Sequence, residues 1–254
     1  MFDFGANWQA FSDKRVDITR LDAATRSLQT LLERDSLHGA TFLDVGCGSG
    51  LFSIAAHCLG ATRVVGIDIN PRSISTSLQN QARLAPNACL NFQEMSVLDA
   101  DAMRGLGQFD LVYAWGSLHH TGAMWQAIQN TMHCVAPHGT LVLALYNKHG
   151  TSPMWAAIKR HYSRLPRRAQ EVVAIPFGGV MYTAKWLVTR QNPLKKERGM
   201  DFWYDVIDWL GGYPYEYATK KQVEEFCAKR SFCLKRYFPA QVPTGCNEFV
   251  FERE

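Results

Sequence analysis

A glycine-rich loop directly after an apolar strand constrains the fold of this 254-residue chain more than any other feature. Residues 42–50 read Phe-Leu-Asp-Val-Gly-Cys-Gly-Ser-Gly, and residues 51–56 have the composition of the first turns of a helix. A Cβ atom at Gly46, Gly48 or Gly50 would hold a ligand away from the backbone. The unpaired N–H groups of the following helix would point at the same ligand. The pattern therefore predicts a ligand site where a strand meets a helix.

A second predicted strand, residues 63–68, ends in the carboxylate of Asp68. An acid some twenty residues after such a loop is the usual partner of a ribose diol in nucleotide-binding α/β units. The loop does not read G-x-G-x-x-G, because Asp44 precedes three glycines at alternate positions. We favour a nucleotide-type ligand over a tight β–α turn that binds nothing.

Strand and helix patterns alternate along the first 146 residues, which is typical of a parallel doubly wound sheet. The predicted strands are 41–45, 63–68, 89–93, 109–114 and 140–146, and the predicted helices are 16–35, 50–58, 71–84 and 122–135. Near the C-terminus, Thr219 and Gln222 form a capping box for a helix at 220–230, and residues 232–238 and 247–252 read as an antiparallel edge pair. We expect the α/β class, with a Rossmann-like doubly wound seven-stranded sheet that is parallel except at its C-terminal edge.

Residues 151–218 differ in composition from the rest of the chain. They hold ten Lys and Arg against six Asp and Glu, while the other residues hold seventeen of each, and they hold twelve of the thirty aromatic residues. Such a shift predicts an insertion with its own role, and we expect a mainly helical lid. The apolar stretch 172–188 is interrupted by proline, glycine and lysine, so we expect a buried lid helix and no membrane span.

The cysteines and the N-terminus indicate the compartment. Seven cysteines are scattered without a C-x-x-C pair, which argues against a disulfide framework and a zinc site. Residues 1–5 lack the basic and apolar regions of a signal peptide. We therefore expect a cytoplasmic protein without a metal.

Four motifs resemble those of class I S-adenosylmethionine (SAM)-dependent methyltransferases, and the bacterial ubiquinone-type and natural-product enzymes look closest. The motifs are Asp44 to Gly50, Gly66-Ile67-Asp68, Phe109-Asp110-Leu111-Val112 and Trp115-Gly116-Ser117-Leu118-His119-His120. The resemblance covers residues 40–147 in motifs and 219–254 in topology only. It implies that SAM is the cofactor.

The resemblance also assigns cofactor-binding residues. Asp44 and Gly46 would face the amino-acid end of SAM, Asp68 would bind the ribose hydroxyls, and Ser96 would lie beside the adenine. Many relatives have an acid where Ser96 stands, and Asp99 is the alternative. The full set implied is Asp44, Gly46, Cys47, Gly48, Gly50, Asp68, Ile69, Ser96, Val97 and Trp115.

The chain then divides into four expected parts. Residues 1–39 are a helical segment covering the cofactor site, and residues 40–150 are the SAM-binding α/β core. Residues 151–218 are the aromatic and basic lid, and residues 219–254 complete the sheet.

Four residues at the ends of the fourth and fifth strands are candidate catalytic groups. His119 and His120 follow the fourth strand, at the edge where ligands bind in open α/β sheets. One of them would be the general base for a hydroxyl acceptor, or both would fix the loop beside the cofactor. Tyr146 and Asn147 end the fifth strand, where they would hydrogen-bond the substrate or cap the strand. In the lid, the candidate substrate-binding residues are Tyr162, Tyr182, Trp203 and Tyr213.

The leading function is transfer of the SAM methyl group to a small-molecule acceptor, with oxygen as the favoured acceptor atom. One alternative keeps the cofactor as substrate, in a cyclisation or lyase reaction that releases methylthioadenosine. Another is an RNA methyltransferase, although a surplus of four positive charges is small for a phosphate-tracking surface. A SAM-binding protein without catalysis is the last. The identity of the acceptor and the oligomeric state stay open.

Overall fold

The computed structural model describes residues 5, 9, 12, 17–190, 206 and 210–254, and these contain one seven-stranded sheet. Its strand order is β3-β2-β1-β4-β5-β7-β6. Neighbours from β3 to β5 run parallel, whereas β7 is antiparallel to both β5 and β6. The strands are β1 Thr41–Val45, β2 Arg63–Asp68, β3 Leu90–Glu94, β4 Phe109–Trp115, β5 Val135–Tyr146, β6 Phe232–Phe238 and β7 Cys246–Arg253. The predicted fold class is confirmed.

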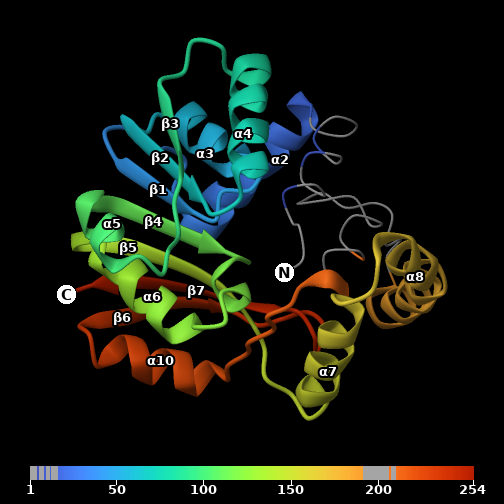
Figure 1. Ribbon diagram of the computed structural model, residues 1–254. Coiled ribbons are helices and arrows are strands. Elements are labelled where there is room, and N and C mark those ends of the chain that lie inside the picture. Colours follow the sequence, from blue (N-terminus) through green and yellow to red (C-terminus); the bar gives the residue numbers. More distant parts are fainter. Residues whose placement is uncertain (1–4, 6–8, 10–11, 13–16, 191–205, 207–209) are drawn as a thin grey trace.

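Helices cover both faces of this sheet (Figure 1). One group comprises α2 Ile18–Leu32, α3 Leu51–Cys58 and α4 Pro71–Leu84; the other comprises α5 Ala100–Gly105, α6 Met124–His133 and α10 Lys220–Ala228. A short 3-10 helix, η1 Leu118–His120, follows β4. The helix α5 was not expected from the sequence, and β5 begins at Val135 because the chain already pairs there with Phe109.

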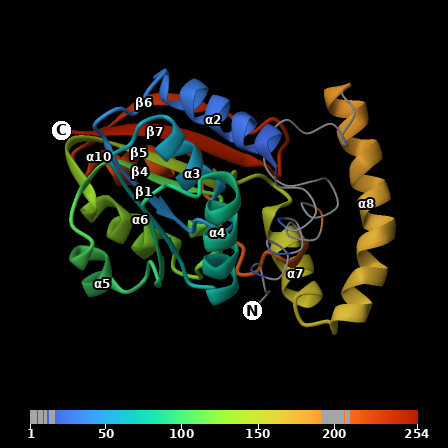
Figure 2. The same ribbon diagram turned by 90° about the horizontal axis from the view of Figure 1, so that it is seen from above.

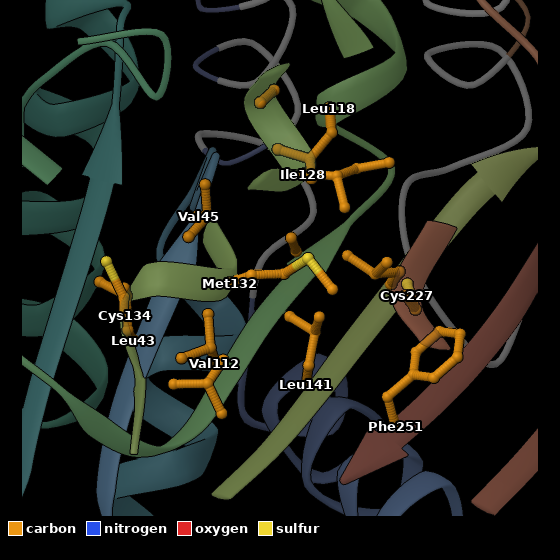
Figure 3. Close-up of a cluster of buried hydrophobic side chains, with 14 of the residues drawn as sticks. Leu43, Val45, Val112, Leu118, Ile128, Met132, Cys134, Leu141, Cys227 and Phe251 are labelled. Carbon is orange, nitrogen blue, oxygen red and sulfur yellow. The ribbon is translucent and has the colours of Figure 1, made fainter. Parts of the chain in front are cut away.

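Two buried clusters form the core, one on each face, because side chains alternate along each central strand. On β1, Leu43 and Val45 join the cluster beneath α6 and α10, while Phe42 joins the cluster beneath α2 and α3. Figure 3 shows the first cluster, in which Met132 of α6 and Cys227 of α10 face the strands. Each fully buried side chain of this size contributes roughly 1.5–3 kcal/mol to folding. The strands are thus fixed by packing on both faces, and their carboxyl ends are held in place.

The lid consists, in its described part, of α7 Ser152–Tyr162 and α8 Arg167–Thr189. Figure 2 shows both helices beside the sheet and not on either of its faces. The Tyr162 hydroxyl donates to the Gln170 carbonyl at 3.1 Å, and the Gln170 amide donates back to the Tyr162 carbonyl at 3.2 Å. The predicted helical insertion is confirmed.

The expectation that 172–188 is a buried helix is wrong for several described side chains. Val172 is 68% exposed, Ile175 is 66% exposed and Leu187 is 57% exposed. The helix packs on the rest of the lid through Ala174 and Phe177 only along one side. Apolar composition predicted burial, but α8 has no described partner for its outer side. Among the described helices, none combines the length and the hydropathy needed to cross a membrane.

The N-terminal residues include two described contacts with α4. Gly5 is buried and so close to Asn70 that an added Cβ would lie 2.3 Å from the Asn70 side-chain oxygen. Ser12 is also buried and donates from its hydroxyl to Asn80 at 2.7 Å. The helix α2 itself packs on the sheet and α3. That residues 1–39 cover the cofactor site, like the other domain boundaries, stays a prediction.

Candidate active site

Left-handed backbone conformations shape the donor loop, by which we mean residues 44–50. Gly46 has φ +77° and donates its N–H to the Ile67 carbonyl at 2.8 Å. A Cβ on Gly46 would lie 2.3 Å from Cβ of Ser117, and one on Gly50 would lie 2.8 Å from Cβ of Ser77. Side chains are disfavoured in this conformation and would also collide. These two positions require glycine, and the loop is therefore bare backbone.

Two side chains of α4 hold the loop in place. The Ser77 hydroxyl donates to the Gly48 carbonyl at 3.1 Å, and the Asn80 amide donates to the Ser49 carbonyl at 2.9 Å. The Cys47 sulfur lies 3.8 Å from the Ser77 hydroxyl, and burial raises the pKa of the Cys47 thiol well above its ordinary value. Cys47 is therefore a neutral packing residue. Sequence reasoning missed Ser77 and Asn80, because single polar residues in a helix carry no motif.

Asp44 is a buried acid beneath the loop. It is 3% exposed, and the Ser53 hydroxyl donates to its carboxylate at 2.7 Å. Burial raises the pKa of Asp44 to about 7, with a further upward contribution from the charge of Asp68 and a downward one from Ser53. A carboxyl that is half ionised near neutral pH becomes fully ionised when a cation arrives. Asp44 is thus suited to receive an ammonium group.

Asp68 is fixed by backbone groups at the end of β2. One carboxylate oxygen accepts from the Gly48 N–H at 3.0 Å and the other accepts from the Asn70 N–H at 2.8 Å. Burial raises the pKa of Asp68, and these two hydrogen bonds oppose the rise. Each oxygen keeps a second lone pair, which can accept a hydrogen bond from a ligand hydroxyl.

The predicted adenine side lies after β2 and β3. Ile69 is 60% exposed, whereas Ser96 and Val97 are half-buried. The Ser96 hydroxyl accepts from the Leu98 N–H at 3.2 Å. Asp99 accepts from the N–H groups of residues 101 and 102 and so forms the N-cap of α5. The carboxylate of Asp99 is therefore already engaged, which favours Ser96 over Asp99 beside the adenine.

The loop after β4 connects this donor side to the histidine pair. Trp115 is the last residue of β4 and packs against the cluster beneath α3. The Ser117 hydroxyl donates to the Val45 carbonyl at 2.7 Å, which ties the ends of β4 and β1 together. His119 is 1% exposed, and within the described part of the chain its Nδ1 has no hydrogen-bond partner. The structure thus brings His119 to the same edge as the donor loop.

His120 has a defined tautomer. Its Nδ1 lies 2.8 Å from the carbonyl oxygen of Pro214, and a carbonyl only accepts, so Nδ1 carries the proton. Burial lowers the pKa of His120 to about 3, the positive charge of Lys159 lowers it further, and the Pro214 bond opposes this. Burial also lowers the pKa of His119 well below its ordinary value. Both rings are neutral at pH 7, and in His120 the lone pair is on Nε2.

A compact cluster of rings lies at the ends of β4 and β5. The ring centroids of His119 and Tyr146 are 4.0 Å apart, and those of Tyr146 and Tyr215 are 4.8 Å apart. Lys159 of α7 is completely buried, with its ammonium nitrogen 4.8 Å from the Tyr215 ring centre and 5.4 Å from the Tyr146 ring centre. We call these residues the acceptor cluster: His119, His120, Tyr146, Lys159 and Tyr215. Sequence reasoning missed Lys159 and Tyr215.

The other predicted residues lie in different surroundings. Asn147 accepts from the Asn247 amide at 3.1 Å and thus links β5 to β7. Tyr162 and Tyr182 belong to the packed part of the lid, where Tyr162, Ile158 and Phe177 line an apolar cavity of about 390 Å³ between α7 and α8. Tyr213 is half-buried, one residue before Pro214. Trp203 lies outside the described residues. None of these assignments is tested, so the predicted roles stay predictions.

The described residues contain no group of three or more His, Cys, Asp or Glu side chains that could hold a metal ion.

The fold and the donor loop together define a class I methyltransferase domain. In agreement with this, residues 43–141 match a family described as a methyltransferase domain. The predicted resemblance is confirmed, as are the enzyme class and the cofactor type, SAM, for this domain.

Curated relatives match over short stretches. The ribosomal protein L11 methyltransferase of Aliivibrio salmonicida is 48% identical over 65 residues, which is 26% of this chain and 22% of that protein. The same enzyme of Thiobacillus denitrificans is 48% identical over 85 residues, or 30% of this chain and 29% of that protein. The chain therefore spans less than a third of the length of these curated relatives.

Solved structures match over most of the chain. Magnesium protoporphyrin IX methyltransferase from Synechocystis PCC 6803, crystallised with SAH, superposes with a TM-score of 0.61 at 14% identity and covers 98% of this chain and 94% of that one. An S-adenosylmethionine-dependent methyltransferase from Mesorhizobium loti gives 0.56 at 16% identity, with 92% and 100% coverage. At these identities the likeness shows the fold alone.

Proposed function

We propose that this protein transfers the methyl group of SAM to an oxygen atom of a small-molecule acceptor. The observation that carries the proposal is the burial of the acceptor cluster beneath α7, at the same edge of the sheet as the donor loop. His119, Tyr146 and Lys159 are each less than 10% exposed. A folded protein or an RNA helix does not reach such a site, whereas a small molecule can be enclosed in it.

The donor loop supplies the cofactor site in this proposal. Asp44 pairs with the ammonium of SAM, Asp68 accepts from the ribose hydroxyls, and N–H groups of the glycine backbone face the carboxylate. Methyl transfer then needs no covalent enzyme intermediate. It needs an acceptor atom in line with the sulfonium methyl group and a site without water.

The histidine pair positions the acceptor in this proposal and is a poor base. Nε2 of His120 has the lone pair and accepts a hydrogen bond from a donor on the acceptor or on a bound water. A group with a pKa of about 3 does not take a full proton from an alcohol at neutral pH. The neutral imidazoles also avoid repulsion with the sulfonium cation, which a charged histidine would add.

A protein acceptor is the main alternative, because the curated relatives are named for ribosomal protein L11. Those matches cover 30% of this chain or less. They carry no information on residues outside the matched stretch. The reaction that consumes SAM itself also fits the donor loop, and the experiment below separates it.

The test combines binding with product analysis. Calorimetry should show SAM and S-adenosylhomocysteine binding in the micromolar range. Methyl-tritiated SAM incubated with a metabolite extract of the cells from which the gene comes should yield S-adenosylhomocysteine and a labelled small product. Methylthioadenosine formed from SAM alone would contradict methyl transfer. Label found only in ribosomal protein or in RNA would contradict the small-molecule acceptor.

A further inference from the structure

We propose that the acceptor is a carboxylate on an apolar, planar body, held by the ammonium group of Lys159, and that the product is a methyl ester. This inference deepens the proposed function and rests on it. It assigns to Lys159, Tyr146 and Tyr215 a binding site for one chemical class of acceptor.

The placement of Lys159 is the first argument. Lysine is among the residues least often fully buried, because its charge loses water. Here the ammonium group is completely buried among the faces of Tyr146 and Tyr215. Ring faces attract a cation, but an aromatic face is only a partial substitute for water. A buried cation beside aromatic walls is the arrangement that binds a carboxylate with an apolar body.

The surroundings of the ammonium group are the second argument. Tyr146 is the last residue of β5, and its ring touches His119, which follows β4. The ends of β4 and β1 are joined by the hydrogen bond from Ser117 to Val45, immediately before the donor loop. Lys159 is thus one ring away from the residues that flank the donor loop. A group bound by its ammonium lies on the methyl side of the site and not in the apolar cavity between α7 and α8.

The charge state of the cluster is the third argument. The positive charge of Lys159 lowers the pKa of both histidines, which are neutral already through burial. The site therefore offers a fixed cation and no strong base. An alcohol acceptor would need a base to remove its proton, whereas a carboxylate is ionised in water near pH 4 and needs none.

The reaction balances without any further reactant. One carboxylate oxygen attacks the methyl carbon of SAM and forms the O–CH₃ bond. The bond between that carbon and sulfur breaks, and its electron pair stays on sulfur. An anion and a sulfonium cation become a neutral ester and a neutral thioether. No proton is transferred, and Lys159 stays protonated from beginning to end.

Alkali distinguishes this product from the other methylated products. Tritiated methyl esters release volatile tritiated methanol in mild alkali, whereas aryl or alkyl ethers and N- or S-methyl products do not. We expect the label transferred from methyl-tritiated SAM to a metabolite extract to become volatile after alkali. Label that stays in the product overturns this inference but leaves the proposed function intact. Failure to bind SAM, or to label any product, counts against the proposed function instead.

Variants of α7 test the role of Lys159. Lys159→Met keeps the length of the side chain and removes the charge, and we expect label transfer at low extract concentration to fall roughly 30-fold or more. High extract concentration should restore much of the rate, because the loss is in KM and not in kcat. Lys159→Arg should recover part of the activity.

Arg160→Met is the matched control, because Arg160 is the exposed neighbour on the same helix. It should label at the wild-type rate. SAM affinity and Tm should be the same in Lys159→Met as in Arg160→Met, which separates acceptor binding from a structural role. Volatile label at an unchanged rate in Lys159→Met would overturn the assignment, and so would a loss that Arg does not recover and that lowers Tm.

Discussion

The donor loop and the acceptor cluster lie at one edge of the same sheet but are built in opposite ways. In the donor loop, backbone groups and short polar side chains make hydrogen bonds to each other, as Gly48 does with both Asp68 and Ser77. In the acceptor cluster, ring faces and one buried ammonium group make most of the described contacts. The first arrangement is set by local chain geometry, and the second by which elements pack together.

This difference has a functional meaning. A loop held by many short hydrogen bonds presents the same surface to every cofactor molecule. A cluster of rings and one cation sets the acceptor through shape and charge, which single substitutions can change. Variants of the donor loop should therefore alter SAM binding, and variants of the lid should leave SAM binding alone. Three predictions test this division.

Gly46→Ala should give the largest effect. The φ of +77° costs a side chain about 1–2 kcal/mol, and the new Cβ would meet Ser117 at 2.3 Å, which adds roughly 1–3 kcal/mol. We expect SAM affinity to fall about 100-fold or more in calorimetry.

Gly116→Ala is the matched control for this variant, because Gly116 has φ +76° but nothing within 4 Å of an added Cβ. It should show the strain alone, as a small drop in Tm with SAM affinity nearly unchanged. Equal losses of affinity in the two variants would show that the contact with Ser117 is irrelevant.

The pH dependence of SAM binding should give the next largest effect. Asp44 has its pKa raised to about 7, so below pH 7 the free protein holds a proton that the SAM ammonium must displace. Affinity should therefore fall as the pH falls from 7 to 5.5, by up to about tenfold per pH unit, and should level off above pH 7. Calorimetry in buffers of different ionisation heat should detect one proton released per SAM bound at pH 6.

Asp44→Asn should bind SAM roughly 30-fold more weakly at pH 7.5 and should lose the pH dependence. Asp101→Asn, a change on the exposed side of α5, should behave like the wild type. A wild-type affinity that is constant between pH 5.5 and 7.5 would contradict the assignment of Asp44.

Tyr162→Phe should give the smallest effect and should be confined to the lid. It removes the hydrogen bond from the Tyr162 hydroxyl to the Gln170 carbonyl, which is worth about 1 kcal/mol. Amide hydrogen exchange near the start of α8 should become faster, while SAM affinity should stay within twofold. A tenfold loss of SAM affinity would mean that the lid and the donor loop act as one unit.

The sequence predicted the donor side well for a physical reason. Glycines at alternate positions after a strand, and an acid at the end of the next strand, are local signals, and β1, β2 and α4 begin and end at the predicted residues. The lid was harder. A lysine in an amphipathic helix is normally exposed, and Lys159 is buried only because α7 packs against Tyr215, far away in sequence. Conversely, Val172 and Ile175 are apolar but exposed, since burial depends on neighbours that a local pattern does not contain.

The complete burial of Lys159 also bears on the timing of turnover. No water or acceptor touches the ammonium group while α7 is in place. Each catalytic cycle therefore includes two displacements of α7, one that admits the acceptor and one that releases the methylated product. Such displacements take microseconds to milliseconds, and in many enzymes they are slower than the chemical step. The clock of this protein is then the hinge between β5 and α7, residues 147–151, and methyl transfer is a fast event between two slow ones.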